Sequence, residues 1–130
     1  MTNLTEECLF CNKKKQNIIY STKFIYVVRD SFPVTKYHSL IIPHRHISDF
    51  FDLNKDELKD LSKTLKKERQ SLLNLDKKIS GFNVGVNAGK DAGQSIMHCH
   101  IHLIPRRKGD IENPRGGVRG VIPSKQKYVR

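Results

Sequence analysis

Three histidines alternate with apolar residues late in the chain, in the segment His98-Cys99-His100-Ile101-His102-Leu103-Ile104. Successive side chains of a β-strand point to opposite faces of a sheet, so the alternation predicts a strand over 98–104 with one apolar face and one imidazole face. Along that face the rings would stand two residues apart, or roughly 6.6 Å. Each ring carries nitrogens that need polar partners, so the row packs poorly in a core and indicates a site on the sheet.

Three chemical interpretations of the imidazole row compete. Imidazole is a common zinc ligand, so the row could form a metal site. Neutral imidazole also attacks phosphorus and titrates near physiological pH, which favours a nucleophile with its helpers. The third interpretation is a half-exposed polar strand face. Three histidines in strict alternation, directly after the loop that contains Gly93-Gln94-Ser95, speak against it.

The remaining hydrophobic pattern predicts a single small α+β domain. Runs rich in β-formers at 18–20 and 24–28 are typical of a hairpin, and further strands are expected at 37–42 and 82–87. A chain of 130 residues, 37% of them hydrophobic, is long enough for one domain with a real core. No internal repeat or second domain is visible in the sequence.

The clearest helix signal begins at Asn54. This residue can cap a helix, and Glu57, three positions later, completes the capping-box pattern. Leucines then recur at helical spacing, which predicts a helix over about 54–73 with a leucine stripe in the core. The stripe is formed by Leu58, Leu61, Leu65 and Leu72.

The charge balance favours an anionic ligand. The net charge is +11, and residues 106–130 alone hold eight Lys or Arg against two acids. Such a balance attracts nucleotides, nucleic acid or acidic proteins without choosing among them. No run approaches the roughly 20 apolar residues of a membrane span, and residues 1–7 lack the basic and apolar regions of a signal peptide. We therefore expect a cytoplasmic protein with no membrane partner.

Two of the three cysteines stand close together, in Cys8-Leu9-Phe10-Cys11. Two thiolates at this spacing suit a tetrahedral zinc site, which needs two further ligands. A redox role is the alternative, and it lacks the thioredoxin-like βαβ setting. The third cysteine, Cys99, falls on the apolar face of the predicted strand, so we expect it to pack in the core.

The stretch from Gly93 to Ile104 resembles the signature of the histidine-triad (HIT) family. The resemblance extends to 83–87, 38–46 and the cysteine pair, in the right order, and most of it matches the compact Hint-like bacterial branch, often described as diadenosine polyphosphate hydrolases. It implies a HIT fold, with a five-stranded antiparallel sheet and two helices, and a homodimer. The HIT domain with its N-terminal zinc-binding segment is then expected at 1–105, followed by a basic tail, 106–130, packed on or near the site.

The resemblance also implies roles for individual residues. His100, the middle histidine, would be the nucleophile that forms a nucleotidyl intermediate, with His102 and His38 completing the catalytic set. Its attacking nitrogen must be neutral, so we expect the other ring nitrogen to donate to a backbone carbonyl. Asp30 matches the ribose-binding aspartate of the family, although an ordinary turn residue before Pro33 is the alternative. Phosphate contacts are expected from Asn87, Gln94 and Ser95.

For zinc, the resemblance proposes His46 and His98 as the ligands that join Cys8 and Cys11 in a structural site, with His44 as the runner-up for the third position. The sequence departs from the family pattern at two places. His44 stands where Lys is usual, and Lys36-Tyr37 replaces the usual Pro-Gly before His38.

The implied activity is hydrolysis or transfer at the α-phosphate of a nucleotide through a nucleotidyl-His100 intermediate. Purine nucleoside phosphoramidates or dinucleoside polyphosphates would be the substrates, and Arg115 and Arg119 would touch their phosphates or close over the partner subunit's site. A zinc-stabilised nucleotide- or nucleic-acid-binding module is the alternative. Nucleic acid is not favoured, because such binding needs no alternating histidines and the chain has no Trp and 8% aromatic residues. A third hypothesis is a deadenylase of nucleic-acid ends, which would use the same His100 as the nucleophile.

Overall fold

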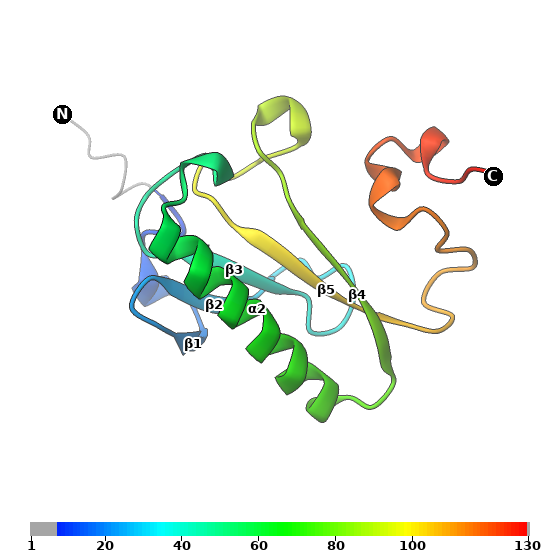
Figure 1. The fold of residues 1–130 in the computed structure, drawn as a ribbon, viewed down its shortest axis with the longest axis horizontal. Helices are drawn as coiled ribbons and strands as arrows, with labels where there is room; N and C mark the ends of the chain where they lie inside the picture. Colours follow the sequence, from blue (N-terminus) through cyan, green and yellow to red (C-terminus); the bar gives the residue numbers. More distant parts are fainter. Residues whose placement is uncertain (1–7, 130) are drawn as a thin grey trace.

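A five-stranded antiparallel sheet forms the centre of the molecule, as expected (Figure 1). The computed structural model describes residues 8–129, so the prediction made for residues 1–7 lies outside the described residues. The strands follow the spatial order β1-β2-β3-β5-β4. Their bounds are β1 Ile18–Ser21, β2 Ile25–Arg29, β3 Ser39–Pro43, β4 Ile79–Val86 and β5 Ile101–Arg107.

The long helix, α2 (Lys55–Leu75), covers one face of this sheet (Figure 1). Its start is the predicted one. The Asn54 side chain accepts from the Glu57 amide at 2.8 Å, and the Glu57 carboxylate accepts from the Asn54 amide at 2.9 Å. The helix ends two residues beyond the predicted end, within the usual uncertainty of helix boundaries.

The buried stripe of α2 is only partly the predicted leucine stripe. Leu61 and Leu72 are buried, but Leu58 is 43% exposed, so its assignment to the core was wrong. The positions that replace it on the inner face are polar, and they are Glu57, Thr64 and Glu68. Two of these carry ion pairs, Glu57 with Arg45 and Glu68 with Arg29, because a buried carboxylate is tolerated only with a charged partner.

Among residues 8–129, α2 is the only α-helix, so the expected second helix is not found there. The other helical turns in this range are 3-10 helices of three to five residues. They are η1 Lys13–Lys15, η2 Phe50–Asp52, η3 Lys90–Ala92, η4 Gly117–Val121 and η5 Pro123–Lys125.

The two faces of the sheet carry different clusters. Between α2 and the sheet lies the larger core, which includes Ile41, Leu103 and, as predicted, Cys99. On the opposite face a smaller cluster joins the N-terminal segment to the sheet. It consists of Phe10, Tyr26, Val28, Leu40 and Ile42.

The predicted strand over 98–104 is shifted. β5 begins at Ile101 and continues to Arg107, so His98 and His100 precede it. The reason is a tertiary contact, because the Cys99 amide donates to the Ile47 carbonyl at 2.7 Å instead of to a strand. Both histidines are buried, as is Cys99 between them.

The imidazoles nevertheless share one face. The ring of Phe10, from the smaller cluster, lies 6.0 Å from that of His98 and 5.0 Å from that of His100, measured between centroids. The rings of His100 and His102 are 5.2 Å apart. The sheet therefore separates the histidines from the core under α2, as the pattern requires.

After β5 the chain forms a surface tail beside β4 (Figure 1). No residue from 106 to 129 is buried. The turn of this tail depends on Gly116, whose φ is +89° and whose missing Cβ would stand 1.8 Å from the Gln126 carbonyl oxygen, so glycine is required there. Across residues 8–129 we find no helix with both the length and the apolar character needed to cross a bilayer.

Candidate functional site

His100 is held with one ring nitrogen turned toward a cavity. Its Nδ1 lies 2.8 Å from the carbonyl oxygen of His98. A carbonyl can only accept, so Nδ1 carries the proton and Nε2 keeps a free lone pair. The expected hydrogen bond to a backbone carbonyl is therefore present. It sets the tautomer that a nucleophilic imidazole needs.

A second chain of hydrogen bonds fixes the tautomers of His38 and His102. The Val34 amide donates to His38 Nδ1 at 3.0 Å, so His38 carries its proton on Nε2. That Nε2 lies 2.9 Å from His102 Nδ1 and donates to it. His102 must then carry its own proton on Nε2. Together, the bond from His100 to the His98 carbonyl and this second chain of hydrogen bonds leave one nitrogen lone pair on His100 and one N–H donor on His102.

Both members of this pair are held neutral. Burial, together with the neighbouring His100 and His38, lowers the pKa of His102 to about 4 against the opposing effect of the Asp30 carboxylate. Burial also lowers the pKa of His38, opposed by the carboxylate of Asp30. At neutral pH neither ring is protonated twice, so His102 acts as a hydrogen-bond donor with no net charge.

Asp30, His38 and His102 also lie close enough to hold a metal ion. The hydrogen-bond chain favours a different interpretation. An N–H of the backbone points at His38 Nδ1, which leaves His38 Nε2 protonated and without the lone pair that a metal requires. Asp30 Oδ2 lies 3.4 Å from His38 Nε2, so it is a second acceptor close to the same N–H group. We therefore interpret this trio as a hydrogen-bonded relay.

The rings of His100 and His102 line a cavity of about 390 Å3, called here the histidine cavity. One wall is apolar and includes Leu9, Phe10, Val28, Leu40 and Ile96, and the polar lining includes Asp30, Asn87 and Ser95. Three of the four predicted nucleotide-binding residues therefore meet here. Asp30 also makes the predicted alternative contact, because its Oδ1 accepts from the Phe32 amide at 2.9 Å.

Gln94, the fourth, does not line the histidine cavity. Its amide nitrogen donates to the carbonyls of Ser48 at 2.8 Å and Ile96 at 3.1 Å, and its oxygen accepts from the Gly89 amide at 2.9 Å. All these bonds brace the loop that carries Asn87 and Ser95 into the cavity. The contact of Gln94 with phosphate stays a prediction.

Four residues form a compact cluster beside the cavity, called here the zinc cluster, and they are Cys8, Cys11, His46 and His98. One ligand atom from each lies within 4.8 Å of all the others. His98 Nδ1 is 3.4 Å from Cys8 Sγ and 3.1 Å from His46 Nδ1, and the latter is 3.1 Å from Cys11 Sγ. Ligands around tetrahedral zinc stand about 3.3–3.8 Å apart, given bonds of about 2.0–2.3 Å.

The protonation of His98 fits a metal as well. Its Nε2 donates to the Pro43 carbonyl at 2.8 Å, which leaves the Nδ1 lone pair directed at the two thiols. Ligating histidines usually make such a bond with their other nitrogen. His44 is outside the cluster, because its Nε2 donates to the Thr22 carbonyl at 3.0 Å. The four-residue set, with His46, is the one that fits zinc.

Sequence reasoning missed Phe10 as a site residue. It lies between the two cysteines and reaches His100 because Cys11 and His98 are brought together across 87 positions. A local pattern carries no signal for such a contact. The available hint was the apolar pair inside Cys8-Leu9-Phe10-Cys11. Apolar side chains that stand between two metal ligands are expected to pack against another part of the protein.

A second cavity, of about 500 Å3, adjoins the first. Asn87 and His102 line both, and the second also takes His38 and the η4 residues Val118 and Val121. Neither Arg115 nor Arg119 lines either cavity. Both guanidinium groups lie over the Tyr128 ring, 5.2 and 4.8 Å from its centroid, so their expected contact with phosphate stays a prediction.

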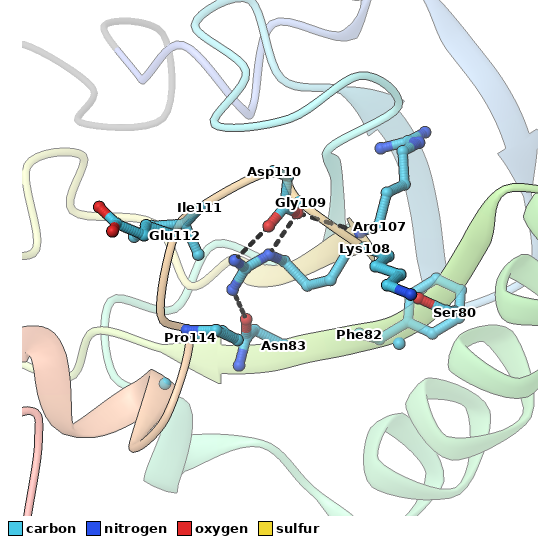
Figure 2. Close-up of a pocket in the computed structure, with 13 residues that line it drawn as sticks. Ser80, Phe82, Asn83, Arg107, Lys108, Gly109, Asp110, Ile111, Glu112 and Pro114 are labelled. Atoms are coloured by element: carbon cyan, nitrogen blue, oxygen red, sulfur yellow. Dashed lines mark hydrogen bonds and ion pairs between the residues drawn. The ribbon is translucent and has the colours of Figure 1, made fainter.

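A larger cavity, of about 770 Å3, lies where the tail leaves the sheet (Figure 2). In this cavity the Arg106 guanidinium donates from Nε and Nη2 to the Asp110 carboxylate and from Nη1 to Asn83 Oδ1. This ion pair holds the pKa of the Asp110 carboxyl below its usual range. No histidine or cysteine lines this cavity, so its size does not make it the reactive site.

Comparison with known proteins identifies the constellation. The model of the HIT domain matches residues 12–109. The chain belongs to the HIT family. This HIT protein is 33% identical over 109 residues to an uncharacterized HIT-like protein of Methanocaldococcus jannaschii, covering 81% of this chain and 83% of the relative.

Two further relatives bear on the site. A protein of Arabidopsis thaliana, named a bifunctional bis(5'-adenosyl)-triphosphatase/adenylylsulfatase, is 34% identical over 88% of this chain and 63% of its own length. The solved structure of a zinc-bound histidine triad family protein from Mycobacterium smegmatis superposes with a TM-score of 0.75 at 26% identity, covering 84% of this chain and 81% of that one. The HIT fold expected from the sequence is thereby confirmed.

Proposed function

We propose that this HIT protein hydrolyses or transfers a nucleotidyl group, with His100 as the nucleophile. The supporting observation is the fixed tautomer of His100, whose Nδ1–H donates to the His98 carbonyl and leaves Nε2 free in the histidine cavity. The Nε2–P bond forms as the bond from the α-phosphorus to the leaving group breaks. The leaving group departs with that electron pair. Covalent catalysis divides a difficult displacement into two easier ones.

In the second step water attacks the same phosphorus, and the Nε2–P bond breaks to release the nucleoside monophosphate. Another acceptor in place of water gives transfer. The positive charge that develops on His100 is stabilised by its bond to the His98 carbonyl. The Nε2–H of His102 is suited to a phosphoryl oxygen, whose negative charge it would stabilise more strongly in the low-dielectric cavity than in water. Ser95 and Asn87 can donate to the remaining oxygens.

The apolar wall of the histidine cavity suits the base of the nucleotide, and we propose a purine there. Phe10 offers an aromatic ring, and Leu40 and Val28 offer aliphatic surface at the sheet. Asp30 can accept from two ribose hydroxyls, because Oδ1 uses only one lone pair on the Phe32 amide. The name of the Arabidopsis relative supports dinucleoside polyphosphates as substrates, and nucleoside phosphoramidates present the same α-phosphorus.

The second cavity is the proposed place of the leaving group. It meets the histidine cavity at Asn87 and His102, and Val118 and Val121 of the tail line it. We propose that the tail after β5, which begins at 108 because β5 continues to Arg107, is a unit beside the HIT domain that selects among leaving groups.

Zinc in the cluster of Cys8, Cys11, His46 and His98 is proposed as structural. The donor set and its spacing support zinc, as does the zinc-bound relative from M. smegmatis. The metal would tie the N-terminal segment to the sheet. With the His98 ring so engaged, its carbonyl remains available to His100.

We also propose a cytoplasmic homodimer. β4 is the edge strand of the sheet next to the tail, and Val84 on it is 47% exposed. An exposed edge with apolar residues is a ready partner for a second copy. The molar mass in solution, measured by light scattering, should be twice that of the chain. A mass equal to one chain would overturn the dimer.

The test of the function is turnover of diadenosine tetraphosphate and adenosine phosphoramidate by matched variants. His100→Ala should abolish turnover, by about a million-fold if it behaves like other covalent nucleophiles. His102→Ala should lower kcat by about a hundredfold, as expected for one lost charge-stabilising donor. Ser48→Ala, which removes a hydroxyl outside the cavity, is the control and should keep wild-type kcat. Full turnover by His100→Ala would reject the mechanism.

A further inference from the structure

Residues 8–11, called here the knuckle, belong to two neighbouring structures at once. The two cysteine thiols are half of the zinc cluster, and the two residues between them, Leu9 and Phe10, line the histidine cavity. Phe10 is 2% exposed, and its ring lies 5.0 Å from that of His100. One short turn therefore supplies metal ligands and a wall against the nucleophile.

His98 connects the two structures a second time. Its ring Nδ1 faces the thiols, at 3.4 Å from Cys8 Sγ, and its Nε2 donates to the Pro43 carbonyl. Its own carbonyl accepts from His100 Nδ1 at 2.8 Å. His98 thus contacts the thiols through its ring and fixes the tautomer of His100 through its carbonyl.

The knuckle has few other attachments to the sheet. The Tyr26 hydroxyl donates to the Phe10 carbonyl, and the Phe10 ring packs in the smaller cluster. The first strand pairing begins only at Ile18. The thiols are the groups that tie the knuckle to His46 and His98, residues far away in the sequence. Among the described residues, the other attachments of the knuckle are the hydrogen bond from Tyr26, the packing of Phe10 and Cys8 against the smaller cluster, and a hydrogen bond from the Gln16 side chain to the Leu9 carbonyl.

We propose that metal binding at the zinc cluster and nucleotide binding in the histidine cavity are thermodynamically coupled, with Phe10 and His98 as positioning residues. The proposal rests on the proposed function for the identity of the cavity's ligand. Metal binding selects the knuckle position in which Phe10 completes the cavity wall, so nucleotide binds more tightly to that state. Coupling of this kind is reciprocal, so nucleotide must strengthen metal binding by the same factor.

The experiment uses the full chain, with zinc and AMP as probes. AMP affinity is measured by calorimetry on zinc-loaded and chelator-treated protein, and zinc affinity by competition with a chelator, with and without saturating AMP. If the zinc-free knuckle occupies its position about a tenth of the time, removing zinc should weaken AMP binding about tenfold. Saturating AMP should then tighten zinc binding about tenfold as well.

Three variants separate coupling from simple contact or loss of stability. Phe10→Ala keeps all four ligands, and its coupling factor should fall toward one. Cys11→His replaces one zinc ligand by another and should keep the coupling. Leu72→Val weakens the core under α2, on the other face of the sheet, and should keep both the AMP affinity and the coupling factor.

A spectroscopic measurement reports on His98 directly. Nitrogen-15 spectra of the histidine rings should show His100 protonated on Nδ1 in the zinc-loaded protein, and a mixture of tautomers after zinc removal. Loss of the tautomer preference with an unchanged fold supports the coupling.

The outcomes are distinguishable. Zinc-loaded protein that does not bind AMP would overturn the proposed function, and this proposal with it. AMP bound equally well with and without zinc would overturn the coupling and leave the proposed function standing. Should the zinc-free chain unfold, Phe10→Ala decides, because an unchanged coupling factor in that variant overturns the role of the knuckle.

Discussion

At the scale of single residues, the chemistry of this HIT protein follows from where three protons lie. Two backbone groups, the His98 carbonyl and the Val34 amide, fix the tautomers of His100 and His38, and through His38 that of His102. No side chain has to be charged for this. The site turns one imidazole lone pair, on His100, and one N–H, on His102, toward the cavity.

Burial of His102 predicts how stability depends on pH. Its pKa is lowered to about 4, against about 6.5 in an unfolded chain. Between these values the unfolded state binds more protons, so the free energy of unfolding should decrease as the pH falls from about 6.5 to 4. His102→Gln should reduce the slope of this decrease by the contribution of up to one proton taken up on unfolding. Urea unfolding at several pH values measures the slope. A pH dependence identical to that of wild type would contradict the assignment.

Tyr37 shows how a departure from the family pattern is accommodated. It adopts a φ of +74°, a region that favours glycine, which explains why Gly is usual at this position. The strain is compensated by packing against the core under α2 and by the guanidinium of Arg29, 5.8 Å from the ring centroid. The loop before His38 thereby keeps the shape that presents the Val34 amide to it.

At the scale of elements, α2 positions the zinc cluster through its first turn. Glu57, 2% exposed, binds Arg45 through both carboxylate oxygens, at 2.7 and 3.2 Å. Arg45 directly precedes His46. The Arg45 guanidinium lowers the pKa of the Glu57 carboxyl, so the pair stabilises the fold at pH values above the usual pKa of a glutamate and is lost on acidification below it.

Two substitutions in this turn should have different consequences. Asn54→Ala removes the cap and should cost about 1 kcal/mol of stability, with zinc affinity unchanged. Glu57→Gln weakens the pair with Arg45 and should cost about 2 kcal/mol, because a buried charge partner is lost. It should also lower zinc affinity, since His46 loses its support. Chemical unfolding and chelator competition measure both, and equal zinc affinity in the two variants would contradict this role of α2.

The elements also show what sequence can predict. The capping box of Asn54 and the apolar face containing Ile101 and Leu103 depend on near neighbours, and both were predicted. The start of β5 was not, because it depends on the Cys99 amide finding Ile47 instead of a strand. The burial of Glu68 was not predicted for a similar reason, since it requires a partner from β2.

At the scale of the whole molecule, the HIT domain and the tail differ in what holds them. The core clusters draw on residues from Phe10 to Leu103, whereas no residue of 106–129 is buried. The basic tail was recognisable from its composition. Its position along β4 was not predictable. It depends on contacts between η4 and β4, and the sequence of the tail has no periodic hydrophobic pattern that would indicate them.

Truncation after Gly109 therefore should leave the fold intact. The free energy of unfolding should change by less than about 1 kcal/mol, as for other surface changes, and AMP affinity should stay at the wild-type value. The KM for diadenosine tetraphosphate should rise, because Val118 and Val121 no longer line the second cavity. A truncated chain that keeps the wild-type KM would contradict the proposed role of the tail in holding the leaving group.

The central claim is that a covalent bond forms between His100 Nε2 and the α-phosphorus. Rapid mixing of the protein with diadenosine tetraphosphate, followed by denaturation at alkaline pH, where phosphoramidates survive, and peptide mass spectrometry tests it most directly. We predict an adenylyl group on the peptide that contains His100, absent when His100→Ala is used. Adenylate on another residue, or steady turnover by a wild-type protein that never carries it, would contradict the mechanism.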